Sequence, residues 1–269
     1  MPTSQNTSEN STKWYQNAGA ALIFFTRLPL WRWYQPPRDA YKAVVEFWPL
    51  VGWITGGLMA ATIYFGSRVM PYGLAILAAI ALRILITGAL HEDGLADFFD
   101  GFGGGAGNRE RILSIMKDSH IGTYGVLAII IYLATLFTCL YHLPPTLAAL
   151  TIFTADPFSK MLAGQIVQMM PYARTENEAK AKVVYRKPSV RAGVLLAIQG
   201  LLPILICYLL PVSDKPAWGS IFFIPCIVMY FIYLKIWHSL RGYTGDCCGA
   251  IFLMVELSLY IAVCVMRGG

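Results

Sequence analysis

Long runs of hydrophobic residues, separated by short polar segments, fill most of the chain after its first 17 residues. A run of about 20 apolar residues can cross about 30 Å of hydrocarbon as a helix, at a rise of about 1.5 Å per residue. Seven runs of about this length predict membrane-spanning helices, at about 44–65, 72–90, 124–142, 146–170, 191–210, 218–237 and 249–266. The pattern therefore predicts an all-α fold, a polytopic membrane helix bundle.

The segment before these runs has a different character. Residues 1–17 are polar and rich in Ser, Thr, Asn and Gln, which predicts a flexible tail rather than a signal peptide. Residues 18–30 are apolar but too short to cross a bilayer, and Arg27 and Arg32 mark their end. We expect this segment to be interfacial or re-entrant, and residues 18–269 to form a single membrane-embedded domain.

Composition supports a membrane protein. Hydrophobic residues make up 57% of the chain and charged residues only 13%, against about 25% in ordinary soluble domains. A soluble enzyme, a disordered chain and a coiled coil are therefore excluded. The net charge of +6 comes without a basic run interleaved with aromatic residues, so no nucleic-acid partner is expected.

Lys and Arg residues are distributed unevenly between the loops. With seven spans, the N-terminal segment and the loops at 91–123, 171–190 and 238–248 share one side of the membrane and carry fourteen of them. The opposite side carries three, Arg68, Lys215 and Arg267. By the positive-inside rule, the N-terminus and the three longer loops are cytoplasmic and the C-terminus is outside.

Away from their ends, the predicted spans contain the charged residues Arg83, Asp156, Lys160 and Glu256. Charges are costly in lipid, so we expect these side chains to face the bundle interior or the interface. Asp156 and Lys160 are four residues apart, on one helix face, and are expected to pair.

Acidic residues concentrate between residues 91 and 120. Asp93, Asp97 and Asp100 are spaced at i, i+4 and i+7, which places all three on one face if the second span continues as a helix. Hard oxygen ligands at this density favour Mg²⁺ or Mn²⁺, with substrate phosphates completing the coordination. The alternative is a solvated acidic helix end, although no Lys or Arg occurs from 84 to 108.

A glycine-rich segment at 101–107 follows, and then Arg109, Arg111, Lys117 and Asp118. Glycines expose backbone N–H groups that can hold phosphate oxygens, and nearby cations can neutralise them. The segment matches neither a Walker A loop nor a dinucleotide-binding motif. The alternative interpretation of these cations is that they are positive-inside residues near lipid headgroups.

Two further polar segments lie on the same predicted side. Residues 241–246 end in Asp246, which can add a carboxylate to a shared site or belong to a turn between helices. Arg174 lies in the basic loop at 171–190, where it can contact an anionic substrate or serve only the positive-inside bias.

At these motifs the sequence resembles the cobalamin synthase family, the adenosylcobinamide-GDP ribazoletransferases. The matching pieces run in family order at 25–29 (FTRLP), 49–52 (PLVG), 91–97 (HEDGLAD), 115–119 (IMKDS), 122–125 (GTYG) and 244–246 (TGD). The resemblance implies a Mg²⁺-dependent enzyme of late cobalamin assembly in the bacterial cytoplasmic (inner) membrane. It implies transfer of activated cobinamide from adenosylcobinamide-GDP to α-ribazole or its 5′-phosphate, with release of GMP.

The chemistry of this reaction assigns roles to the candidate residues. Attack of a hydroxyl on a pyrophosphate needs neutralised phosphate oxygens and a proton acceptor. The predicted metal ligands are Asp93, Asp97, Asp100 and Asp246. The predicted proton acceptors are Asp97, Asp100 and Asp118, among which the sequence does not choose. The predicted substrate contacts are Arg27, Arg109, Arg111, Lys117, Lys160 and Arg174.

Two other functions fit the pattern less well. A CDP-alcohol phosphotransferase needs an Arg where Asp97 stands. A cation transporter would place its acids at mid-depth in a broken helix, whereas these acids lie at a helix end beside cations. The expected partners are the two small-molecule substrates and the lipid bilayer. A homo-oligomer or association with other cobalamin-pathway enzymes stays open, as does the base of the lower ligand.

Overall fold

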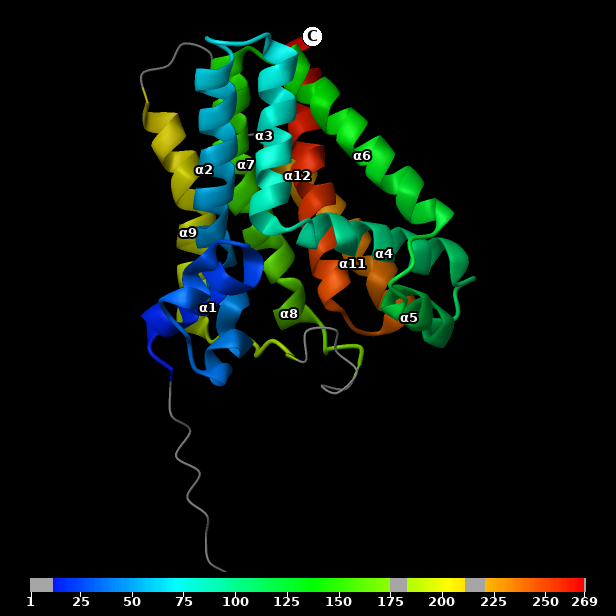
Figure 1. The fold of residues 1–269 in the computed structure, drawn as a ribbon. Helices are drawn as coiled ribbons and strands as arrows, with labels where there is room; N and C mark the ends of the chain where they lie inside the picture. The colour runs from blue at the N-terminus through cyan, green and yellow to red at the C-terminus, as the bar shows by residue number, and fades with distance from the viewer. Residues whose placement is uncertain (1–11, 175–182, 211–220, 269) are drawn as a thin grey trace, which may run out of the picture.

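A computed structural model describes residues 12–174, 183–210 and 221–268. Within these residues every regular element is helical, apart from an isolated bridge between Tyr172 and Tyr243. Several of the long helices pack around α7 (Pro145–Gly164), and the C-terminus lies at the end of the bundle opposite α1 (Trp14–Phe25) (Figure 1). The predicted all-α membrane bundle is confirmed.

Some of the remaining elements follow the apolar runs of the sequence, and others lie in the more polar segments between them. They are η1 (Pro29–Arg32), η2 (Arg38–Phe47), α2 (Trp48–Gly66), α3 (Tyr72–Thr87), α4 (Leu90–Gly104), α5 (Arg109–Lys117), α6 (Thr123–His142), α8 (Ile166–Met169), α9 (Val190–Leu209), α11 (Phe223–Leu240) and α12 (Gly245–Gly268). Part of the predicted span at 218–237 falls outside the described residues.

Among the described residues, five helical segments are long and apolar enough to cross a membrane, or six if one bent pair of helices is a single span, rather than the seven predicted. The five are η2 with α2, then α6, α9, α11 and α12. The predicted span at 146–170 corresponds to α7. Asp156, Pro157 and Lys160 lower the hydropathy of this continuous helix, so that it is not among the five apolar segments. It is instead the buried centre of the bundle, packed against α2, α9 and α12.

The predicted span at 72–90 breaks near its end, and this changes the setting of the acidic cluster. Gly88 and Ala89 both have positive φ, at 65° and 57°, which ends α3 in the left-handed conformation typical of a helix C-terminus. The next helix, α4, starts at Leu90 and is bent by 88° from α3, so that the pair counts at most as one broken span. The acidic residues therefore lie on a separate, crosswise helix (Figure 1).

Close contact between α2 and α7 buries a charged pair. A Cβ at Gly52 would lie 2.7 Å from Asp156 Oδ1, and one at Gly56 would lie 2.9 Å from Asp156 Cβ. Small residues four apart let membrane helices approach in this way. Asp156 accepts hydrogen bonds from Thr55, at 2.8 Å, and from Lys160, which is wholly buried. The predicted pair is confirmed.

A second buried ion pair joins α3 to α12. Arg83 Nη1 donates to both carboxylate oxygens of Glu256, at 2.9 and 2.7 Å, and Tyr260 donates to the same carboxylate at 2.8 Å. Arg83 also donates to the hydroxyl of Tyr132 on α6. All four predicted intramembrane charges thus face the bundle interior, as expected from their cost in lipid.

The N-terminal elements pack beside the start of α2. Helix α1 begins at Trp14, so the last residues of the predicted tail at 1–17 form its first turn, while residues 1–11 lie outside the described part. With 12 residues, α1 is too short to span, in line with the expectation for residues 18–30. Trp14 and Trp33 are exposed, as is typical of aromatic residues at a membrane interface.

Candidate active site

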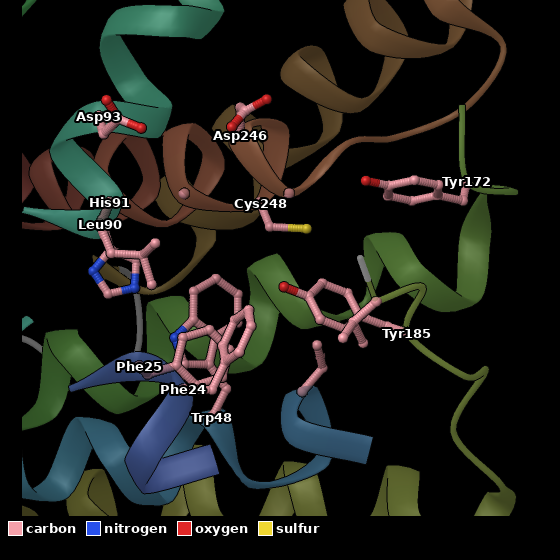
Figure 2. Close-up of a pocket in the computed structure, with 14 residues that line it drawn as sticks. Phe24, Phe25, Trp48, Leu90, His91, Asp93, Tyr172, Tyr185, Asp246 and Cys248 are labelled. Carbon is pink, nitrogen blue, oxygen red and sulfur yellow. The ribbon is translucent and has the colours of Figure 1, made fainter. Parts of the chain in front are cut away.

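A cavity of about 310 Å³ lies where α1, α2, α4 and the first turn of α12 meet (Figure 2). Side chains from the segments at 172 and 183–185 complete its wall. Two of the predicted site residues line it, Asp93 and Asp246. The cavity therefore joins the acidic cluster to the polar segment before the last helix, which are about 150 residues apart in the chain.

Glycines at the crossing of α4 and α12 bring these two carboxylates to one cavity. A Cβ on Gly94 would lie 3.0 Å from the carbonyl oxygen of Asp246, and one on Gly249 would lie 3.3 Å from Cα of His91. The two backbones are therefore in direct contact. Figure 2 shows Asp93 and Asp246 on the same side of the cavity.

The other two aspartates of α4 have different surroundings. Asp97 is 8% exposed and does not line the cavity. Asp100 is buried and accepts hydrogen bonds from the backbone N–H groups of Gly122, at 2.7 Å, and Gly125, at 2.9 Å. Its carboxylate therefore caps the start of α6, a role that the sequence analysis did not foresee.

Three carboxylates do not converge on one point. Among the residues that the structure describes, no three His, Cys, Asp or Glu side chains could hold a metal ion together. Mg²⁺ is commonly bound through one or two carboxylates, with water and substrate phosphates as its other ligands. Asp93 and Asp246 fit that kind of site, whereas the described residues form no closed site built from protein alone.

Two of the predicted substrate-binding arginines, Arg109 and Arg174, donate hydrogen bonds to backbone carbonyls of other segments. Arg109 donates through Nε to the carbonyl of Leu240, at 2.8 Å, and through Nη2 to that of Ala173, at 2.7 Å. Arg174 donates to the carbonyl of Leu113 at 2.7 Å. These bonds fix α5 to the segments that follow α8 and α11.

The other predicted cations differ sharply in exposure. Arg111 and Lys117 are exposed on α5, and their side chains make no hydrogen bond or ion pair with the described part of the chain. Arg27 is exposed and packs over Gly88, at the break between α3 and α4. Lys160 is buried behind the cavity wall, with its Nζ 4.3 Å from the ring centroid of Phe252.

Asp118 lies in the turn between α5 and α6 and forms an exposed pair with His120. Its Oδ1 lies 2.7 Å from His120 Nδ1 and accepts the backbone N–H of the same residue at 3.1 Å. This hydrogen-bonded pair lowers the pKa of Asp118 and raises the pKa of His120. Asp118 is not part of the cavity wall.

Aromatic residues form much of the wall, and the sequence analysis did not find them. The rings of Phe25, Trp48 and His91 are nearly parallel, and Phe24 and Tyr185 lie beside them. These residues come from segments far apart in the sequence. No spacing within the chain could have revealed the group, because only the tertiary fold assembles it.

Comparison with known proteins gives consistent matches over nearly the whole chain. A family model described as cobalamin-5-phosphate synthase matches residues 17–264. A Leptospira interrogans protein named adenosylcobinamide-GDP ribazoletransferase is 32% identical over 251 residues, covering 91% of this chain and 94% of its own. A Leptothrix cholodnii protein of the same name is 34% identical over 253 residues, with coverages of 90% and 92%. No solved structure matches the chain.

Proposed function

The chain belongs to the cobalamin-5-phosphate synthase family, and on that premise we propose that it transfers activated cobinamide from adenosylcobinamide-GDP to α-ribazole or its 5′-phosphate. It is a membrane-embedded transferase of late cobalamin biosynthesis. The names of its relatives supply the substrates of the proposal. The carboxylates of Asp93 and Asp246, on two helices but in one cavity, are the observation that carries it.

The proposed chemistry is the attack of a ribazole hydroxyl on the phosphorus nearest the cobinamide, with GMP as the leaving group. Asp93 and Asp246 would hold Mg²⁺, which when bound neutralises charge on the phosphate oxygens. Direct contact between the backbones of α4 and α12 fixes these two side chains relative to each other. Such positioning lowers the barrier by holding the reacting groups in line.

Asp97 is the proposed proton acceptor for the attacking hydroxyl. It lies one helical turn beyond Asp93 on α4, close to the cavity end of that helix. Asp100 uses both carboxylate oxygens to cap α6, and Asp118 is paired with His120 in an exposed turn. Asp97 is chosen because, of the three predicted acceptors, it lies nearest to Asp93 along the chain, on the same helix.

Arg111 and Lys117 are proposed to meet the substrate phosphates. Both lie on α5, which packs against α4, and neither side chain is engaged elsewhere among the described residues. Arg109 and Arg174, by contrast, are held by backbone carbonyls. We therefore expect Arg111→Ala and Lys117→Ala to insert normally but to raise KM for the corrinoid or lower kcat.

The test is GMP release by the purified protein in lipid vesicles, given adenosylcobinamide-GDP and α-ribazole with and without Mg²⁺. We expect Asp93→Asn and Asp246→Asn each to lower kcat by about 100-fold or more, because each removes a charged ligand at nearly constant volume. Asp39→Asn is the matched control, since Asp39 is an exposed acid away from the cavity. Full activity in both cavity variants would contradict the proposal.

Orientation and alternative functions have separate readouts. We propose that the cavity faces the cytoplasm at the bacterial inner membrane, on the basis of the Lys and Arg distribution. A reporter fused after Arg267 that reads as cytoplasmic would contradict this.

CMP release from a CDP-alcohol, or ion flux in vesicles without GMP release, would instead support the two alternative functions.

A further inference from the structure

One half of the cavity is built from stacked aromatic rings. The rings of Phe25 and Trp48 have centroids 5.0 Å apart and an interplanar angle of 10°. His91 continues the stack, with its ring 5.7 Å from that of Trp48 and inclined by 22°. All three line the cavity and are at most 4% exposed, so their positions are fixed by packing.

Tyr185 lies beside this stack in the cavity wall and is held in place by its neighbour. Arg186 donates two parallel hydrogen bonds to Glu46, at 2.8 and 3.1 Å, and its backbone N–H bonds to the carbonyl of Lys42 at 2.8 Å. A two-point arginine–carboxylate contact of this kind fixes geometry as well as adding energy. The ring of Tyr185 in turn lies 6.0 Å from that of Phe24, edge to face.

We propose that this aromatic half of the cavity binds the planar base of the nucleoside acceptor, with its sugar directed toward Asp93 and Asp246. The inference rests on the proposed function, because that function supplies a substrate with a fused aromatic base. Aromatic side chains recognise such bases through their faces, as they do in proteins that bind single-stranded nucleic acids. The base then lies between Tyr185 and the stack that includes Trp48.

Size and polarity select this base over the other two ring systems of the reaction. The cavity, at about 310 Å³, is too small for a corrin macrocycle. Guanine carries amide, amino and carbonyl groups along one edge, and burying them without partners is costly. Phe24, Phe25, Val45 and Leu90, which line this half, offer no side-chain hydrogen bond. Its polar side-chain atoms are few: Trp48 Nε1 and His91 Nε2, both buried without a hydrogen-bond partner among the described residues, and the hydroxyl of Tyr185. A benzimidazole-type base, with one free ring nitrogen and otherwise apolar edges, fits such a wall.

The arrangement also explains how the acceptor hydroxyl reaches the reacting phosphate. Figure 2 shows the rings of Phe24, Phe25 and Trp48 on one side of the cavity and the two carboxylates on the other. A nucleoside anchored by its base therefore presents its ribose hydroxyls to the side where the phosphates would bind. The corrinoid and GDP parts of the other substrate remain outside this half of the cavity.

Tyr185→Ala and Phe24→Ala test the proposal, because both side chains are partly exposed and their loss does not open the bundle core. We expect each to raise KM for α-ribazole by about 5- to 150-fold, the effect of removing one aromatic partner from a stacked base. KM for adenosylcobinamide-GDP should stay within about 2-fold. Tyr141→Ala, an exposed tyrosine at the far end of α6, is the matched control.

Binding without turnover separates this inference from the proposed function. Equilibrium dialysis with radiolabelled α-ribazole should show weaker binding to Tyr185→Ala than to the unaltered protein, and guanosine should compete poorly. Wild-type GMP release together with unchanged α-ribazole binding in both variants would overturn the base site alone. So would competition by guanosine equal to that by unlabelled α-ribazole. Absence of GMP release from the unaltered protein would overturn the proposed function instead.

Discussion

A methyl group at position 94 would test whether the contact between α4 and α12 sets the geometry of the two cavity carboxylates. In Gly94→Ala the new Cβ lies 3.0 Å from the carbonyl oxygen of Asp246 and 3.2 Å from its Cα, with Cα of Gly249 at 3.5 Å. These are backbone atoms, so no side-chain rotation relieves the contact and the helices must move apart by a few tenths of an ångström. Asp93 and Asp246 then separate.

The expected effect is larger on turnover than on stability. Overpacking lowers the free energy of unfolding by about 1–3 kcal/mol, but replacing a helical glycine by alanine raises it by about 1 kcal/mol. A displacement of about 1 Å costs about 100-fold in rate, so a shift of a few tenths should lower kcat by about 4- to 10-fold.

The assay is kcat for GMP release, with the thermal unfolding midpoint as a check on folding. Gly193→Ala on α9 is the matched control, because its added Cβ would meet no described atom within 4 Å beyond its chain neighbours and its own helix backbone. It should keep full kcat and gain slightly in stability. Full kcat in Gly94→Ala would refute the argument that this contact positions the carboxylates.

Three further predictions follow from buried or paired charges. Asp100→Asn should lower the free energy of unfolding by about 1–2 kcal/mol, measured by denaturation in detergent, because its carboxylate caps α6; an unchanged value would argue against the cap. Glu256→Gln should cost about 3–5 kcal/mol in the same measurement, because it leaves Arg83 buried without its carboxylate partner. The hydrogen bond to Asp118 raises the pKa of His120 and lowers that of Asp118 itself, so the pair stabilises most between their usual values of about 3.9 and about 6.5. Its contribution fades as pH rises through the pKa of His120 or falls through that of Asp118. An NMR titration of Asp118→Asn should find the pKa of His120 nearer about 6.5, and an unchanged value would contradict the pairing.

Local patterns in the sequence were sufficient to predict those features of the structure that depend on residues close together in the chain. The apolar runs predicted α6 and α9 nearly to the residue, and the spacing of Asp156 and Lys160 predicted their pairing. The spacing of Asp93, Asp97 and Asp100 is likewise realised on one helix.

Features that depend on unusual backbone or distant contacts were not predictable. The bend before α4 requires Ala89 at positive φ, which alanine seldom adopts, so the sequence favoured a straight span. The apolar run at 146–170 predicted an ordinary span that carries the Asp156–Lys160 ion pair, whereas packing against α2, α9 and α12 makes α7 the core of the bundle. Trp48 and Tyr185 line the same cavity only because the tertiary fold brings their segments together.

The cap that Asp100 places on α6 has a mechanical consequence for an enzyme in a bilayer. Helix α6 leans away from the other long helices, and only 28% of its apolar stretch is buried inside the protein (Figure 1). Its inclination therefore responds to the thickness of the surrounding hydrocarbon, as expected from hydrophobic mismatch. Because two N–H groups at its first turn are bonded to α4, a change in that inclination pulls directly on the helix that carries Asp93. Lipid chain length thus becomes a variable that acts on the geometry of the cavity.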